Sequence, residues 1–281
     1  MITTLGKTYI KRYLAGQVAS IAQAISFGVG TSAEALGDTR LAFEYGRSDI
    51  FLTSYDFTND KLVFKAELPS DLAGKIYEVG IWSNAVNTNE TVYGSKSITT
   101  FDSETETWLT GGGAPVFTTT STRIGIDSLN HTPSASTTAT SNITGLVQDF
   151  SGYSSADIFA FSFNVGNANT SNVVVRFLTD ASNYYTITLG AQTAGYKTVT
   201  ATKGSATATG SPNWGSITEI QVLTTSGAGG ASSVDYDGIR IEDVDYVNPE
   251  YVLVARELLA SPFTKVPGQI QELEFQLAVS V

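Results

Sequence analysis

Three carboxylates near the end of the middle part of the chain are the best candidates for binding an ion. Asp235, Asp237 and Glu242 lie in DYDGIRIED (residues 235–243). Carboxylate oxygens are hard ligands of the kind that calcium prefers, so these side chains are candidates for a structural calcium site. The same segment alternates, and strict alternation would place Asp235 and Asp237 on one face with Ile239 and Ile241. That pattern fits a strand with an acidic end in solvent, so both interpretations stay open.

Four aromatic residues are candidates for binding sugars. Tyr153, Tyr184, Tyr185 and Trp214 lie in a long segment rich in Thr, Ser, Gly and Asn. The faces of aromatic rings pack against the C–H surfaces of sugars, but Tyr and Trp also fill the cores of β-sandwiches. The four residues therefore indicate either a glycan-binding platform or core packing.

Catalytic chemistry has few candidates in this sequence. Cysteine is absent, and the one histidine, His131, lies in a Thr/Ser-rich stretch that we interpret as a loop. Paired carboxylates of a glycosidase would have to come from residues whose spacing gives no sign that any two converge. Those carboxylates are Asp149, Asp157, Asp180 and Glu219. We therefore predict no catalytic residues and no enzyme.

The stretch FGVGTSAEALGDTRLAFE (residues 27–44) contains two glycines in a pattern that invites comparison with a phosphate loop. Such a loop follows a strand and opens a helix, so that free backbone N–H groups face the phosphate. Here neither the Gly-Lys-Ser/Thr of a P-loop nor the third glycine of a dinucleotide fingerprint follows, and LAFEYGR (residues 41–47) is strand-like. We predict a structural turn and no cofactor other than the candidate calcium.

Composition and charge exclude two kinds of partner. The 281-residue chain has a formal charge of −11 and a pI near 4.5, and its 16 Lys and Arg residues are scattered. A nucleic-acid partner needs a basic patch, so none is expected. The apolar stretches are much shorter than the roughly 20 residues that span a bilayer, so no membrane insertion is expected.

The two ends of the chain predict a mainly β domain with one short helix. Apolar residues at i,i+4 indicate a helix over residues 7–15, and period-two patterns indicate strands at 62–68, 75–82 and 271–281. The first two strands, joined by the turn-rich PSDLAGK (residues 69–75), are expected to form an antiparallel pair. An antiparallel sheet with an N-terminal helix follows as the base domain.

The central part of the chain predicts a second domain. Its clearest strands are short, regularly spaced and separated by glycine turns, at residues 158–165, 172–179, 183–190, 217–225 and 234–243. This pattern is typical of a β-sandwich of the jelly-roll kind. We expect a discontinuous base domain at residues 1–105 and 246–281, with a sandwich at 116–243 inserted through adjacent linkers.

Three segments outside the sandwich carry a family resemblance. They are ISFGVGTSAEALGDTRLAFEYGR (25–47), LVFKAELPSDLAGKIYEVGIWS (62–83) and LVARELLASPFTKVPGQIQELEFQLAVSV (253–281). Together, in this order, they resemble the N-terminal domain of tail-collar, fibre-type and head-decoration proteins of tailed bacteriophages. The resemblance covers about half of the chain and does not extend to the inserted sandwich.

The resemblance implies a non-enzymatic structural protein on the outer surface of a tailed-phage virion, as a capsid decoration or cement protein, a head fibre, or a tail or baseplate appendage. It implies other virion proteins as partners and a homo-oligomer, with a trimer as the expected state. The base domain would dock on the particle and the sandwich would project. The alternative is an adhesion module in which the sandwich binds a host glycan.

Overall fold

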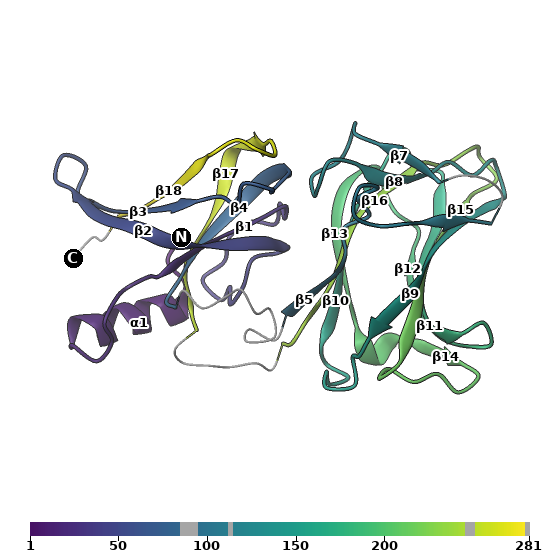
Figure 1. Ribbon diagram of the computed structural model, residues 1–281, viewed down its shortest axis with the longest axis horizontal. Coiled ribbons are helices and arrows are strands. Elements are labelled where there is room, and N and C mark those ends of the chain that lie inside the picture. Colours follow the sequence, from purple (N-terminus) through teal and green to yellow (C-terminus); the bar gives the residue numbers. More distant parts are fainter. Residues whose placement is uncertain (85–94, 112–114, 245–250, 279–281) are drawn as a thin grey trace. The chain divides into compact units, whose positions relative to one another are not determined.

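A computed structural model describes residues 1–84, 95–111, 115–244 and 251–278. The chain divides into two compact units (Figure 1). Unit 1 comprises Met1–Tyr93 and Tyr246–Val281, and unit 2 comprises Gly94–Asp245. The predicted fold class is confirmed: both units are built of antiparallel sheets, with one short α-helix near the N-terminus.

Helix α1 (Thr4–Leu14) begins three residues before the predicted start. Thr3 is its N-cap, because its Oγ1 accepts a hydrogen bond of 2.8 Å from the Gly6 N–H. Gly6 is required where α1 meets residues 253–265, because a Cβ there would lie 2.0 Å from the Val254 carbonyl oxygen. In the part of the chain that the structure describes, α1 and every other helix are too short or too polar to cross a bilayer.

Unit 1 is built on one path of six antiparallel strands in the order β17-β4-β1-β2-β3-β18. The strands are β1 (Ala24–Gly28), β2 (Glu44–Asp56), β3 (Lys61–Glu67), β4 (Gly74–Trp82), β17 (Leu253–Lys265) and β18 (Glu272–Ala278). Strand β2 pairs with β1 through its first half and with β3 through its second half. Helix α1 packs against β17.

The expected antiparallel pair of residues 62–68 and 75–82 is wrong, although both strands exist. Strand β3 pairs with β2 and β18, whereas β4 pairs with β1 and β17. Phe64 of β3 and Ile76 of β4 nevertheless belong to one hydrophobic core. The PSDLAGK connection therefore joins strands of a shared core and is not a hairpin turn.

The glycine-containing stretch of residues 28–43 encloses a carboxylate that belongs to the protein itself. Glu78 is fully buried and accepts hydrogen bonds from the backbone N–H groups of Gly30 at 3.0 Å and Phe43 at 2.9 Å. A Cβ on Gly30 would lie 2.4 Å from Glu78 Oε1. The loop thus binds an anion through its N–H groups, as a phosphate loop would, but the anion is an internal side chain.

Unit 2 consists of two six-stranded antiparallel sheets. The first has the order β13-β10-β16-β8-β7, and β5 also pairs with β16; the second has the order β14-β12-β11-β15-β9-β6. The strands of the first sheet are β5 (Ser95–Thr99), β7 (Val116–Thr118), β8 (Ser128–His131), β10 (Ile158–Val165), β13 (Gly195–Thr202) and β16 (Val234–Glu242). Those of the second are β6 (Leu109–Thr110), β9 (Thr138–Gln148), β11 (Thr170–Asp180), β12 (Asn183–Gly190), β14 (Thr207–Thr209) and β15 (Ile217–Ser226).

The first boundary of the inserted domain lies earlier than predicted. Residues 95–105 were expected in the base domain, but β5 pairs with β16 of unit 2, and Phe101 and Trp108 lie in the unit 2 core. The TGGGAP segment (residues 110–115), predicted as a hinge, lies within unit 2, although its residues 112–114 fall outside the described residues. Residues 245–250 of the second predicted linker also fall outside them.

A β-bulge in β16 changes which residues share a face. Ser162 is opposite Gly238 and Phe163 is opposite Tyr236, so Asp237 is an extra residue in β16. Tyr236 and Ile239 therefore both point into the core. The expected grouping of Asp235 and Asp237 with Ile239 and Ile241 is wrong, because the bulge shifts the alternation by one residue.

Candidate functional site

The carboxylate of Asp235, predicted as a calcium ligand, is surrounded by side-chain donors. Ser121 Oγ and Asn164 Nδ2 donate to Oδ2, the latter at 3.2 Å, and Asn130 Nδ2 donates to Oδ1 at 2.5 Å. These donors come from strands β8 and β10 and from the segment before β8. Asp235 thus fastens neighbouring elements to β16.

Asp237 is buried in the same region, and its carboxylate holds the segment before β8 by accepting hydrogen bonds from the backbone of that segment. Its Oδ2 accepts hydrogen bonds from the backbone N–H groups of Arg123 at 3.0 Å and Ile124 at 3.1 Å, and from the Tyr196 hydroxyl. Its Oδ1 has no hydrogen-bond partner among the described residues. Burial raises the pKa of Asp237 to about 7, against the lowering effect of its hydrogen bonds.

Glu242 lies at the far end of β16 and pairs with Arg240, whose Nε is 2.6 Å from Glu242 Oε1. It therefore does not join the other two acids in a shared set of ligands. Across the described part of the chain, no group of three or more His, Cys, Asp or Glu side chains could hold a metal ion. Calcium binding by Asp235, Asp237 and Glu242 stays a prediction.

Three of the four predicted glycan-binding aromatics pack at one end of the unit 2 core. Tyr185 and Trp214 stack on each other with ring centroids 3.9 Å apart and planes within 4°. Trp214 also contacts Phe159, and Tyr153 contacts Phe150, both of which are fully buried. These three aromatics are used mainly in packing and do not form an open platform with Tyr184.

Tyr184 points to the opposite face of the second sheet, because side chains alternate along a strand. It lies over the guanidinium of Arg176, whose Cζ is 4.9 Å from the ring centroid. Arg176 lies between the core residues Val175 and Phe177 on β11, so its side chain also points away from the core. Arg176 Nε is buried and has no hydrogen-bond partner among the described residues.

A strip of polar side chains crosses this outer face in register. Arg176 is opposite Thr186 on β12 and Gln221 on β15, and Gln221 is opposite Asn142 on β9. Directly opposite residues point to the same face. With neighbouring strands about 4.8 Å apart, the four side chains extend over about 14 Å. We call Asn142, Arg176, Tyr184, Thr186 and Gln221 the outer strip.

The acids considered for glycoside hydrolysis do not form a pair on the outer strip. Asp149 accepts from the Ser151 N–H, Asp157 from the Ser154 N–H, and Asp180 from the Ser182 N–H, so each holds a turn. Glu219 accepts a hydrogen bond of 2.8 Å from Gln221 Nε2 and lies beside the strip. Arg176, Gln221 and Asn142 were not predicted as site residues, although their positions in alternating strands could have indicated a shared outer face.

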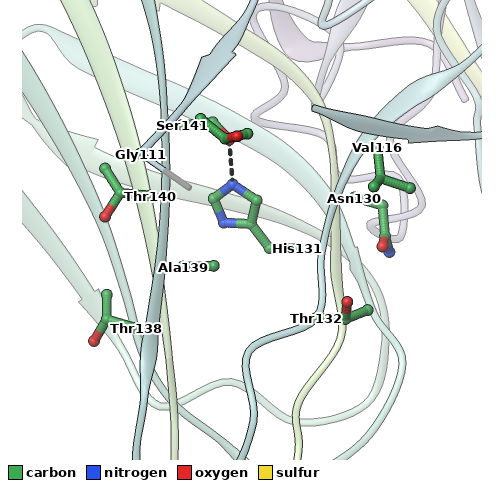
Figure 2. A pocket seen from close by; sticks show the side chains of 10 residues that line it. Gly111, Val116, Asn130, His131, Thr132, Thr138, Ala139, Thr140 and Ser141 are labelled. Carbon is green, nitrogen blue, oxygen red and sulfur yellow. Dashed lines mark hydrogen bonds between the residues drawn. The ribbon is translucent and has the colours of Figure 1, made fainter. Parts of the chain in front are cut away.

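His131 lies in strand β8 and not in the predicted loop, with only 3% of its surface exposed. Its ring points toward β9, as Figure 2 shows, and Nε2 is 2.8 Å from Ser141 Oγ while Nδ1 is 3.1 Å from Thr224 Oγ1. Burial lowers the pKa of His131 to about 4. The imidazole is therefore neutral near pH 7, and it borders a pocket at the edge of unit 2.

Comparisons with known proteins give partial matches to solved structures. No family model matches the chain, and no curated protein matches it. A family 11 carbohydrate-binding module of a Clostridium thermocellum cellulase is 11% identical, with a TM-score of 0.40, over 54% of this chain and 95% of the module. A family 28 module specific for non-crystalline cellulose is 14% identical, with a TM-score of 0.35, over 52% of this chain and 94% of the module.

The chain also resembles parts of larger proteins. An agarase, AgWH50C, is 12% identical with a TM-score of 0.39, over 56% of this chain and 25% of the agarase. The matched region is 24% of the length of PfGH50B and 22% of that of a Streptococcus pneumoniae Endo-D glycoside hydrolase domain. Because the identities are this low and the TM-scores lie below 0.5, the function of this chain must be argued from its own residues.

Proposed function

We propose that this protein is a non-catalytic carbohydrate-binding protein, in which the outer strip of unit 2 binds an extended glycan. The observation that carries the proposal is the Arg176 guanidinium beneath the Tyr184 ring, in register with the polar side chains of Thr186 and Gln221 on the neighbouring strands. A guanidinium offers five N–H donors, which can donate to the hydroxyl groups of a sugar.

The other side chains of the outer strip suit a neutral, hydroxylated chain. Gln221 and Asn142 each carry an amide that both donates and accepts hydrogen bonds, and Thr186 adds a hydroxyl. Tyr184 supplies a ring face for a sugar. A strip about 14 Å long favours several sugar units of a chain over a single sugar.

Binding without hydrolysis is part of this proposal. Glu219 is the acid beside the outer strip, and its carboxylate is held by Gln221. Glycoside hydrolysis needs two carboxylates about 5 to 10 Å apart across the scissile bond. Asp149, Asp157 and Asp180 each hold a turn, so their hydrogen bonds explain them without catalysis.

For unit 1 we propose the role that the sequence resemblance implies, which is docking on the outside of a tailed-phage particle, with the chain as a homo-oligomer. Exposed aromatic residues on and after β2 favour a docking surface: Phe51 is 57% exposed and Phe57 is 87% exposed. Apolar patches of this kind mark sites of protein association. Cryo-electron microscopy of purified particles should locate the chain, and its absence from them would refute this role.

The test of glycan binding compares point variants on an array of plant, algal and bacterial polysaccharides, followed by titration of each hit. Arg176→Ala and Tyr184→Ala should each weaken binding at least tenfold. Thr200→Ala, at an exposed position on β13 of the other sheet, should bind like the unaltered protein. If no polysaccharide binds, or if both strip variants bind as tightly as the control, the proposal is wrong.

A further inference from the structure

Arg176 is the charged side chain of the outer strip, and no acid of the described part of the chain neutralises it. Its guanidinium lies beneath the Tyr184 ring and forms no ion pair with any residue that the structure describes. By contrast, Arg47, Arg240 and Arg256 pair with carboxylates at 2.5, 2.6 and 2.8 Å. A chain with 27 Asp and Glu residues thus leaves this guanidinium available to an acidic group from outside.

The part of Arg176 that a ligand can reach is the end of its guanidinium. Nε is buried, whereas the residue as a whole is partly exposed, so the two Nη nitrogens are the donors that face solvent. A planar guanidinium presents its N–H groups in a fork that fits two oxygens of one anionic group. A carboxylate or a sulfate ester is therefore a better acceptor for these donors than a single sugar hydroxyl.

Glu219 is the acid of the protein that lies beside this position. Gln221 is opposite Arg176, and Glu219 precedes Gln221 by two residues on β15, so it lies on the same face of the sheet. The Glu219 carboxylate accepts a hydrogen bond of 2.8 Å from Gln221 Nε2 and does not pair with Arg176. Its negative charge opposes an acidic ligand at Arg176, which gives a sign that experiment can check.

Uncharged side chains continue the strip on both sides of Arg176. Gln221 and Asn142 follow in register on β15 and β9, and Thr186 and Thr207 follow on β12 and β14. Each direction covers two strand spacings, or about 10 Å. A second acidic group within that distance would meet an amide or a hydroxyl, and the net charge of −11 would repel a glycan with an acid on every sugar.

We propose that the glycan of the outer strip carries acidic sugars separated by neutral ones, and that Arg176 binds one carboxylate or sulfate group through its Nη nitrogens. This inference rests on the proposed glycan binding and adds the class of glycan to it. A carboxylate and a sulfate ester both carry a single negative charge on oxygens that accept from a guanidinium. Probes of both kinds are therefore needed.

Matched pairs of sugars test for the acidic group. Methyl glucuronide and methyl glucoside differ only in a carboxylate that replaces a hydroxymethyl group, as do the corresponding galacturonide and galactoside, and methyl galactoside 6-sulfate supplies the sulfate. At about 50 mM, well above a millimolar Kd, an acidic sugar should shift the ¹H–¹⁵N backbone signals of Arg176 and Gln221 in a saturable way. At least one acidic sugar should bind about tenfold or more tightly than its neutral partner, and added salt should reduce that difference.

Point variants connect this preference with Arg176. Arg176→Gln should bind both members of each pair equally, whereas Arg176→Lys should keep part of the preference, because the charge remains and only the planar fork is lost. Glu219→Gln should strengthen binding of the acidic sugar, because it removes a neighbouring negative charge. Lys7→Gln, at an exposed position on α1 of unit 1, changes the net charge as Arg176→Gln does and should leave the preference unchanged.

The possible results distinguish this inference from the proposed function. If neutral polysaccharides bind the outer strip but the two members of every pair bind equally, the acidic group is refuted and glycan binding stands. If a folded Arg176→Gln variant keeps the preference, the acidic sugar binds elsewhere and the inference is overturned. If neither these sugars nor any polysaccharide of the array binds, both proposals fail.

Discussion

The Glu78 carboxylate and the Arg256 guanidinium lie 2.8 Å apart in the interior of unit 1. Glu78 is fully buried and Arg256 is 2% exposed. Arg256 also pairs with Asp38 at 2.8 Å, and Glu78 accepts from the N–H groups of Gly30 and Phe43. Residues of three distant segments, the same three that carry the phage resemblance, therefore meet in one hydrogen-bonded network.

Glu78→Ala should destabilise unit 1 by about 3–5 kcal/mol, because it leaves the buried Arg256 and the backbone N–H groups of Gly30, Ala42 and Phe43 without their acceptor. Urea denaturation followed by intrinsic fluorescence measures the change. Glu274→Gln is the matched control: it removes an ion pair of 3.4 Å to Lys65 at the surface and should change stability by no more than about 1 kcal/mol. Equal effects of the two variants would contradict this account.

Gly30→Ala should also destabilise unit 1, for a steric reason. The new Cβ would lie 2.4 Å from Glu78 Oε1 and 2.5 Å from the Ala42 Cβ, so the Glu78 side chain would have to leave its hydrogen bonds. Gly37→Ala, a few residues later in the same loop, meets nothing within 4 Å. Thermal unfolding should give a Tm that falls clearly for Gly30→Ala and stays nearly constant for Gly37→Ala.

Asp237→Asn should change how the stability of unit 2 depends on pH. Burial raises the pKa of Asp237 to about 7 from an ordinary value of 3.8. Between these values the folded protein keeps a proton that the unfolded chain has lost, so the contribution of Asp237 to stability falls as pH rises from about 4 to about 7. Denaturation of the Asn variant across this range should lack that fall; an unchanged profile would refute the assignment.

His131→Gln should have the opposite effect. Burial lowers the pKa of His131 to about 4 from 6.5, so the unfolded chain takes up a proton first as pH falls. Its contribution to stability is present above pH 6.5 and is lost between about pH 6.5 and pH 4. The two groups therefore offset each other in the native protein, and the Gln variant should become less stable as pH rises from about 4 to about 7. A profile like that of the native protein would show that His131 does not titrate as described.

Tyr184→Ala and Tyr185→Ala should separate binding from stability. Tyr185 stacks on Trp214 and donates a hydrogen bond of 2.9 Å to the Pro212 carbonyl, so its loss should cost about 3 kcal/mol, as for other aromatic-to-alanine changes in cores. Tyr184 lies on the outer strip, and its loss should weaken glycan binding with little effect on unfolding. Paired calorimetry and binding assays measure both, and the reverse result would refute the outer strip.

The sequence allowed five of the twelve strands of unit 2, β10, β11, β12, β15 and β16, to be predicted, because alternation is a local property. The predicted strands at residues 158–165 and 183–190 coincide with β10 and β12. What alternation could not predict was the insertion of Asp237 as a bulge, which is defined by the partner strand and not by β16 itself. For the same reason the pairing of β3 with β18, far apart in the sequence, was missed in favour of a local hairpin.

The candidate site was less accessible to sequence reasoning. Tyr184 and Tyr185 are adjacent and chemically alike, and only the position of the β11–β12 pair in the sandwich decides which of them faces outward. Arg176 looks like an ordinary surface charge in the sequence. Its significance comes from register, which places it between Thr186 and Gln221 on two other strands.

Strand β5 near the start of unit 2 and strand β16 near its end pair with each other, with Ser95 opposite Glu242. A unit that begins and ends at neighbouring points can replace a short surface loop of another protein without separating the ends of that loop. Unit 2 should therefore fold when it is inserted into a surface loop of a different protein. Evolution or an engineer could exchange it for another module while the host scaffold keeps its own connectivity.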